Sequence, residues 1–157
     1  MTKPILEVKD LDVFFGTGDA QVVAVRGASF SINPGETVAL VGESGSGKSV
    51  SALSILQLLP YPSASHSTRS SIIFKNQQLV SSDTKTLMGI RGNKISMIFQ
   101  EPMTSLNPLH VIEKQISETL ALHSGLTGPE ARRKCIELLE LVGLQKPETR
   151  LQSYCLL

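Results

Sequence analysis

Alternating apolar and polar residues predict two strands near the start of the chain. Residues 5–15 (ILEVKDLDVFF) and residues 22–32 (VVAVRGASFSI) both approach the period of two that is typical of a half-exposed sheet. Gly27 interrupts the second segment, so we expect a bulge or bend there. The sequence NPGE at 33–36 predicts a tight turn after that strand. The chain therefore opens with a β-rich lead-in.

Two shorter segments are almost wholly apolar and predict buried strands. Residues 37–41 (TVALV) are rich in β-branched side chains, as in the buried strands of parallel sheets, and residues 94–100 (KISMIFQ) have a similar character. Between them we expect a helix from about Lys48 to Leu59, where Pro60 ends it. The order of strand, loop and helix is that of an α/β core.

The rest of the chain is mainly helical in pattern. Residues 60–76 begin as a loop rich in serine and proline and end in a short predicted strand, IIFKN. An apolar residue at every third or fourth position over 109–123 marks one face of a helix. A last helix is expected over 129–142, with proline near its start and glycine just past its end. We therefore expect an α/β fold with a mainly helical second half.

Composition and charge exclude several classes of function. The 157 residues are 41% apolar and 18% charged, which are the values of a folded domain. The net charge is +1 without a basic stripe, so nucleic acid is not expected as a partner. Cys135 and Cys155 form neither a CxxC pair nor a metal-ligand spacing, and Cys135 is expected to be a buried helical thiol. The most apolar stretch, SALSILQLLP, is too short to span a bilayer.

The segment GESGSGKS, Gly42 to Ser49, carries the clearest chemistry in the sequence. Its spacing is that of a phosphate-binding loop, and it lies between a predicted strand and a predicted helix. Glycines let the main chain approach a ligand closely, so that its N–H groups can surround phosphate oxygens. Lys48 places a cation against the outer phosphates, and the hydroxyl of Ser49 can bind Mg²⁺. The sequence therefore predicts a nucleoside triphosphate with Mg²⁺ as the ligand.

Two other kinds of site that use glycines in a similar pattern can be excluded. A nucleophile elbow requires Gly-x-Ser-x-Gly, and Ser46 stands where its second glycine should be. A dinucleotide fingerprint requires Gly-x-Gly-x-x-Gly, and Val50 occupies the place of its last glycine. The remaining alternative is a serine- and glycine-rich turn that binds nothing, and both the lysine and the flanking segments argue against it.

Beyond the loop, the sequence resembles the ATP-binding subunits of ABC transporters over essentially its whole length. The resemblance is carried by VRGASFSINPGETVALVGESGSGKSVSALSILQLLP and RGNKISMIFQEPMTSLNPLH. The segment FQEPMTSLNP looks like the branch that imports dipeptides, oligopeptides and nickel. RGNKISMIFQEPM together with SALSILQLLP is most similar to the N-terminal half of a tandem ATPase of the microcin C and oligopeptide type. The resemblance implies an ABC ATPase that powers the uptake of peptides.

The resemblance also implies roles for single residues. Gln100 matches the Q-loop glutamine, which approaches Mg²⁺ and the γ-phosphate; it is the candidate catalytic residue and, with Ser49, a candidate metal ligand. Phe15 matches the aromatic residue that stacks on adenine, and it could equally belong to the core. The candidate ATP-binding residues are Gly42, Glu43, Ser44, Gly45, Ser46, Gly47, Lys48, Ser49, Val50 and Phe15.

Partners, location and domain organisation follow from the same resemblance. Glu101–Asn107 would form the edge of a groove that receives a transmembrane permease subunit, although a solvated turn is the alternative. A second ATPase domain or subunit would join it, with the assembly lying peripherally on the cytoplasmic face of the inner membrane. The expected fold class is an α/β P-loop NTPase of ABC type, incomplete here. Its expected parts are a β-rich N-terminal subdomain (1–36), a partial parallel-sheet core up to the Q-loop (37–100) and the start of the helical subdomain (101–157).

The sequence stops at RLQSYCLL, before the signature, the Asp-Glu strand and the switch histidine of the family pattern. Because hydrolysis needs a metal-binding aspartate and a carboxylate that orients water, we expect this chain to bind ATP with negligible turnover. We also expect residues 37–41 and 94–99 to expose apolar surface, which would make the chain poorly stable. Two alternatives stay open: a non-catalytic remnant with weak or no nucleotide binding, and a less favoured ATPase of DNA repair, for which no heptad pattern is present.

Overall fold

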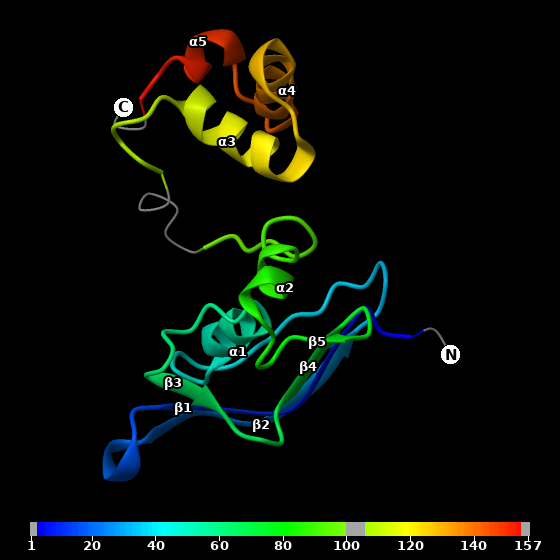
Figure 1. Cartoon of the computed structure of the whole chain (residues 1–157), viewed down its shortest axis with the longest axis vertical. Coiled ribbons are helices and arrows are strands. Elements are labelled where there is room, and N and C mark those ends of the chain that lie inside the picture. Colours follow the sequence, from blue (N-terminus) through cyan, green and yellow to red (C-terminus); the bar gives the residue numbers. More distant parts are fainter. Residues whose placement is uncertain (1–2, 100–105, 155–157) are drawn as a thin grey trace. The chain divides into compact units, whose positions relative to one another are not determined.

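The computed structural model describes residues 3–99 and 106–154. The chain divides into two compact units, Met1–Ile95 and Ser96–Leu157, each with its own core. The first unit contains a sheet and short helices, and the second contains helices only in its described part (Figure 1).

The sheet of the first unit is antiparallel. Its strands are β1 (Leu6–Phe15), β2 (Val22–Ile32), β3 (Ala64–His66), β4 (Ser71–Phe74) and β5 (Gln77–Gln78). The order is β2-β1-β4-β5, and β3 also pairs with β1. The two long strands confirm the alternation seen in the sequence. Because β2 lies at an edge of this sheet, its outer side is open to the segment that follows it.

A bulge in β2 confirms the interruption predicted at Gly27. Leu11 pairs with Ala28 and Val13 pairs with Val25, so that two residues of β2, Arg26 and Gly27, lie opposite Asp12 alone. Gly27 has a φ of +60°, a conformation that glycine adopts without strain. Its N–H donates to Oδ1 of Asp12 at 2.8 Å, which holds the bulge in place.

Three short helical segments complete the first unit: η1 (Gly18–Ala20), α1 (Lys48–Ile55) and α2 (Thr84–Met88). Helix α1 begins where it was predicted and ends four residues early, since Gln57 turns to a φ of +52°. The side chain of Arg91 then holds the end of the helix through the carbonyl groups of Leu56 and Gln57. The sequence pattern predicted neither α2 nor the strand β3, which lies inside the predicted 60–71 loop.

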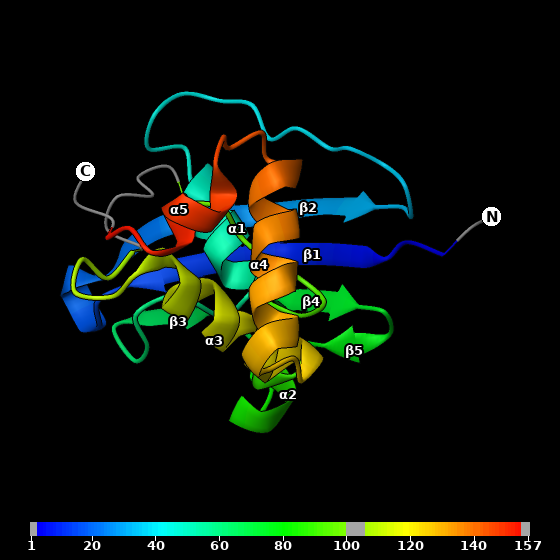
Figure 2. The same ribbon diagram turned by 90° about the horizontal axis from the view of Figure 1, so that it is seen from above.

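The two predicted buried strands are not formed. Residues 37–41 and 96–99 belong to no strand, and the parallel pairing among the described residues is a single bridge, Arg91 with Ile95. Figure 2 shows the segment between β2 and α1 as a wide arc without a neighbouring strand. Val41 and Ile98 are 92% and 95% exposed, so the predicted apolar exposure is observed. The physical reason is that an apolar segment becomes a strand only when another strand accepts its hydrogen bonds.

The second unit is a small helical assembly. Its helices are α3 (Ile112–Ser124), α4 (Gly128–Leu141) and α5 (Pro147–Leu151). The first two match the predicted helices closely, whereas α5 was not predicted. Cys135 and Leu151 are fully buried and pack with Leu139 against partly buried residues of α3. The predicted burial of Cys135 is therefore confirmed.

Candidate functional site

The loop of Gly42–Ser49 leads directly into α1. Gly47 caps the helix in the left-handed conformation, with a φ of +87°, and the first helical hydrogen bond runs from Ser51 N to Gly47 O. The amides of Lys48, Ser49 and Val50 precede that bond and have no partner within the helix. The first turn contains no acidic residue, so the positive end of the helix is open to an anion.

Close contacts require glycine at position 47, and a β-carbon at position 42 would lie near a side chain that can move. A methyl group at Gly47 would meet the carbonyl oxygen of Ala24 at 2.6 Å and Cγ2 of Val25 at 2.9 Å. A methyl group at Gly42 would meet Oγ of Ser46 at 2.8 Å. A β-carbon at Gly45 would meet nothing within 4 Å, so only the left-handed backbone conformation, with a φ of +81°, restricts which residues can replace it. The loop is thus packed against β2 on one side and folded tightly on itself.

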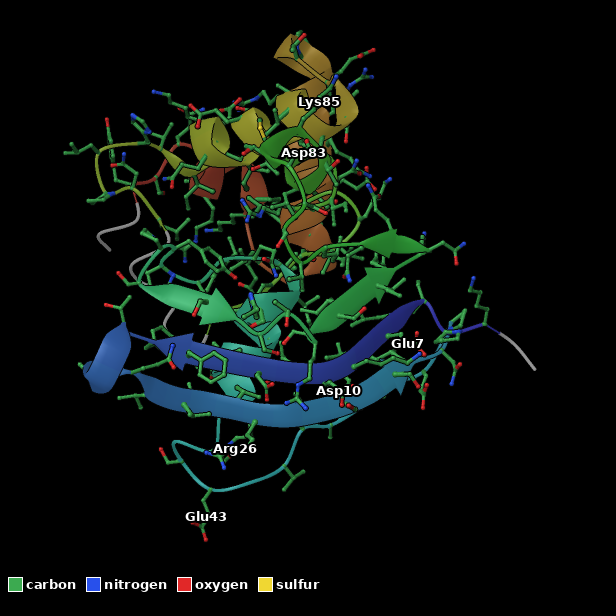
Figure 3. The ribbon with its side chains drawn as sticks, turned by 60° about the horizontal axis from the view of Figure 1, so that its bottom comes forward. Glu7, Asp10, Arg26, Glu43, Asp83 and Lys85 are labelled. Carbon is green, nitrogen blue, oxygen red and sulfur yellow. The ribbon has the colours of Figure 1, made fainter. Side chains whose placement is uncertain are left out.

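Lys48 occupies the centre of the loop. Its Nζ donates to the carbonyl oxygens of Gly42 at 2.8 Å and Glu43 at 2.6 Å, and to Oγ of Ser46 at 3.2 Å. These contacts hold the ammonium group against oxygen atoms of the glycine loop. Glu43 lies on the outside of the arc, away from β2 (Figure 3), and Lys48 contacts its main-chain carbonyl rather than its carboxylate. The loop therefore combines the Lys48 cation with a helix start whose first amides have no partner within the helix.

A pocket of about 410 Å³ lies between the loop and the bulged part of β2. Gly42, Ser46 and Lys48 line it from the loop, and Val25 and Arg26 line it from the strand. Two of the residues that line it are cationic and none is a carboxylate. A larger pocket of about 780 Å³ lies near Tyr61 and His66 in the same unit, and no residue of the glycine loop lines it. Size alone would point to that pocket, whereas charge and free donors point to the loop.

The remaining predicted site residues have different surroundings. Ser49 is exposed, and its hydroxyl forms no hydrogen bond with any described residue, so it is free to bind a ligand. Ser44 is exposed on the loop and Val50 packs against the core of the first unit. Phe15 is half-buried, packs against the same core and does not line the pocket beside the loop. Its assignment to adenine stays a prediction.

Gln100 and residues 101–105 lie outside the described part of the chain. Of the predicted groove edge, Leu106 and Asn107 are described and exposed. Gln115 of α3 holds the main chain of Asn107, donating to its carbonyl at 3.1 Å and accepting from its N–H at 2.8 Å. The roles assigned to Gln100 and to the groove edge remain predictions.

Two residues that sequence reasoning missed support the site from β1 and β2. Asp12 is buried, and Arg69 and then the Gly27 amide hold the pKa of its carboxyl below its ordinary value. Arg26 lines the pocket through the bulge that Asp12 anchors. The one feature of the sequence that could have indicated Arg26 was Gly27. A glycine inside a strand pattern indicates a bulge, and a bulge changes the direction of the neighbouring side chains.

Neither a metal centre nor a membrane span is evident in the described residues. No three histidine, cysteine or acidic side chains of residues 3–99 and 106–154 gather closely enough to hold a metal ion. The helices of the same residues all fall short of the length and apolar character needed to cross a membrane.

Comparison with known proteins places this geometry in a family. The profile of the ABC transporter family matches residues 25–155. The chain is 57% identical, over 98% of its length, to the peptidoglycan transport ATP-binding protein YejF of Agrobacterium fabrum and covers 28% of that protein. It is 45% identical, over 96% of its length, to the oligopeptide transport ATP-binding protein OppD of Bacillus subtilis and covers 42% of it. The chain thus spans less than half the length of these relatives.

A solved structure shows the same fold. The ATP-binding cassette MJ0796, in a dimeric post-hydrolysis state bound to ADP and Pi, matches with a TM-score of 0.76 and 25% identity. The match covers 95% of this chain and 61% of the cassette. The fold class expected from the sequence, an α/β ABC ATPase fold, is confirmed, although the described sheet is antiparallel. The family profile and the fold agree, and the chain belongs to the ABC transporter family.

Proposed function

We propose that this chain is the nucleotide-binding part of an ABC transporter ATPase and that residues 42–50 bind ATP with Mg²⁺. The observation that carries the proposal is the loop before α1: Lys48 lines a pocket without carboxylates, and the first amides of the helix that it begins have no partner within the helix. A polyanion fits such a site because donors and positive charge are already in position before it binds.

Lys48 and the helix start would hold the phosphate chain. The contact from Lys48 Nζ to Ser46 Oγ is the longest of its three, at 3.2 Å, and a phosphate oxygen would replace it most easily. Ser49, with its free hydroxyl, would bind Mg²⁺, and the family resemblance assigns Gln100 as its second protein ligand. With so few protein ligands, Mg²⁺ would keep several water molecules and use phosphate oxygens.

The transport role follows from the relatives. Their names describe ATP-binding proteins for peptidoglycan, oligopeptide and dipeptide transport. We therefore propose that this chain serves the import of peptides, together with transmembrane permease subunits that contact Glu101–Asn107 and a second ATPase domain or subunit. It would act peripherally at the cytoplasmic face of the inner membrane. Hydrolysis is not part of the proposal, because the residues that line the pocket include no carboxylate to orient water.

A binding titration tests the proposal directly. The full chain is titrated with a fluorescent ATP analogue in the presence of Mg²⁺, with circular dichroism as the check that it is folded. We expect saturable binding that falls at least about tenfold in Lys48→Ala, which loses a charge-assisted contact to phosphate. Lys85→Ala, which removes an exposed lysine from α2, is the matched control and should bind normally. A folded sample that binds nothing, or binding indifferent to Lys48→Ala, would favour a remnant without nucleotide-binding function.

A further inference from the structure

Arg26 carries a positive charge that no described residue pairs with. Its guanidinium forms no hydrogen bond or ion pair with any residue in 3–99 or 106–154, although its side chain lines the pocket beside the glycine loop. Arg69 and Arg91 of the same unit, by contrast, are both held by hydrogen bonds. An arginine without a partner beside a pocket is free to meet an anionic ligand.

The position of Arg26 is set by the bulge. In a regular strand Arg26 and Gly27 would lie opposite two residues of β1, whereas here both lie opposite Asp12 alone, and the Arg26 side chain is exposed. The buried carboxylate of Asp12 fixes this irregularity, since Oδ1 accepts from Gly27 N and Oδ2 accepts from Arg69 at 2.8 Å. Figure 3 shows Arg26 projecting from β2 into the arc of the segment that joins β2 to α1. The bulge thus directs the guanidinium to the side of the strand on which the loop lies.

The charges of the pocket favour a ligand that carries several linked anionic groups. Lys48 is already bonded to the loop through Gly42, Glu43 and Ser46, while Arg26 faces the same pocket from β2. The two cations therefore lie on two walls of one pocket of about 410 Å³, with the hydroxyls of Ser46 and Ser51 also lining it. A ligand with a single negative group could contact either Lys48 or Arg26, but not both. A chain of linked phosphates offers oxygen atoms to both.

We propose that Arg26 is a second phosphate-binding cation of this site and that it selects for the length of the phosphate chain. The inference rests on the proposed function, because it assumes that the glycine loop binds the same nucleotide. Arg26 donates its planar fork to phosphate oxygens that the loop amides leave exposed, while Asp12 acts as a positioning residue through the bulge. ATP gains this contact, and a nucleotide with one phosphate does not.

The test compares two variants that remove the same charge. Arg26→Gln removes the cation that lines the pocket from β2, and Lys85→Gln removes an exposed cation of α2 that does not line the pocket. Affinity for MgATP and for AMP is measured by titration of the full chain, at two salt concentrations. We expect Arg26→Gln to weaken MgATP binding about tenfold, which is the effect of one charge-assisted hydrogen bond, and to flatten its salt dependence. Binding of AMP should change little, and Arg26→Lys should recover part of the loss.

The outcomes separate this inference from the function on which it rests. If the wild-type chain does not bind MgATP, or Lys48→Ala does not weaken it, the proposed function fails and Arg26 has no role. If Lys48→Ala abolishes binding while Arg26→Gln behaves like Lys85→Gln, the loop binds nucleotide and the inference about Arg26 is wrong. Equal weakening of MgATP and AMP by Arg26→Gln would also overturn the proposed selection by phosphate number.

Discussion

Gly47, at the start of α1, lies directly against the main chain of Ala24 in β2. A β-carbon on Gly47 would come within 2.6 Å of the Ala24 carbonyl oxygen, closer than any normal contact allows. The phosphate-binding loop is therefore not an independent turn. Its geometry depends on where the β2 edge strand lies, and the bulge that follows Val25 helps to set that position.

Substitution of Gly47 by alanine should damage both the fold and the site. The new methyl group would clash with Ala24 and Val25, and the residue would have to keep a φ of +87°. We expect the free energy of unfolding to fall by about 1–3 kcal/mol and nucleotide binding to be lost. Gly35→Ala is the control, because Gly35 has a φ of +76° and a β-carbon there would meet nothing within 4 Å. Denaturant unfolding of both variants should show the larger loss in Gly47→Ala, and equal losses would contradict the contact.

The contrast between β2 and residues 37–41 shows what the sequence could predict. Strands β1 and β2 were predictable because they pair with each other across a short turn, so alternation and register appear in one stretch of sequence. Residues 37–41 have an equally strong β pattern and form no strand. An apolar pattern reports the tendency to be buried, whereas a strand also needs a partner that local sequence cannot supply.

In the candidate site, too, the residues that were predictable are those whose role depends on local sequence alone. The loop of Gly42–Ser49 was predictable because its chemistry lies in eight consecutive residues. Arg26 was not predictable, since its orientation depends on a bulge held by Asp12, whose other partner, Arg69, is 57 positions further along the chain. Strand β3 was missed for a related reason. Its segment is rich in serine and proline, which predict a loop, and it becomes a strand by pairing with β1, which is distant in the sequence.

Asp12 should make the stability of the chain depend on pH. Arg69 and the Gly27 amide lower the pKa of its carboxyl from the ordinary value of 3.8 in the folded state. The carboxylate therefore contributes stability above about pH 4, and this contribution is lost as the pH falls through the lowered pKa. We expect Asp12→Asn to lower the free energy of unfolding at pH 7 and to have a smaller effect at about pH 3, measured by denaturant titration at each pH.

Asp10→Asn provides the matched control for that measurement. Asp10 lies on the same strand, and its carboxylate accepts no hydrogen bond from any described residue (Figure 3). The substitution makes the same change of charge and shape without releasing the bulge. Equal effects of Asp10→Asn and Asp12→Asn at pH 7 would show that the bulge does not depend on the Asp12 carboxylate.

Arg91 should stabilise the end of α1. Its Nε donates to the carbonyl of Leu56 at 2.8 Å and its Nη2 donates to that of Gln57 at 2.6 Å, so two acceptors at the helix end depend on one side chain. Arg91→Met would leave both carbonyls without this partner and should lower the free energy of unfolding by about 1–3 kcal/mol. Arg26→Met, which removes an arginine without a partner in the described chain, should leave it unchanged. Urea unfolding of the two variants distinguishes them, and equal midpoints would contradict the assignment.

Leu151 should hold the second unit together. It is fully buried with Cys135 and Leu139, so Leu151→Ala should cost about 2–5 kcal/mol through lost contacts and a cavity. The Cys135 thiol reports on this core, because burial, and then the nearby Glu113, raise its pKa and burial shields it from reagents. In a Cys155→Ser background, a disulfide reagent should react slowly with Cys135 in the parent chain and much faster in Leu151→Ala. Leu122→Ala, at a position that is 74% exposed, should react at the parent rate, and equally fast reaction in both variants would show that Leu151 does not protect the core.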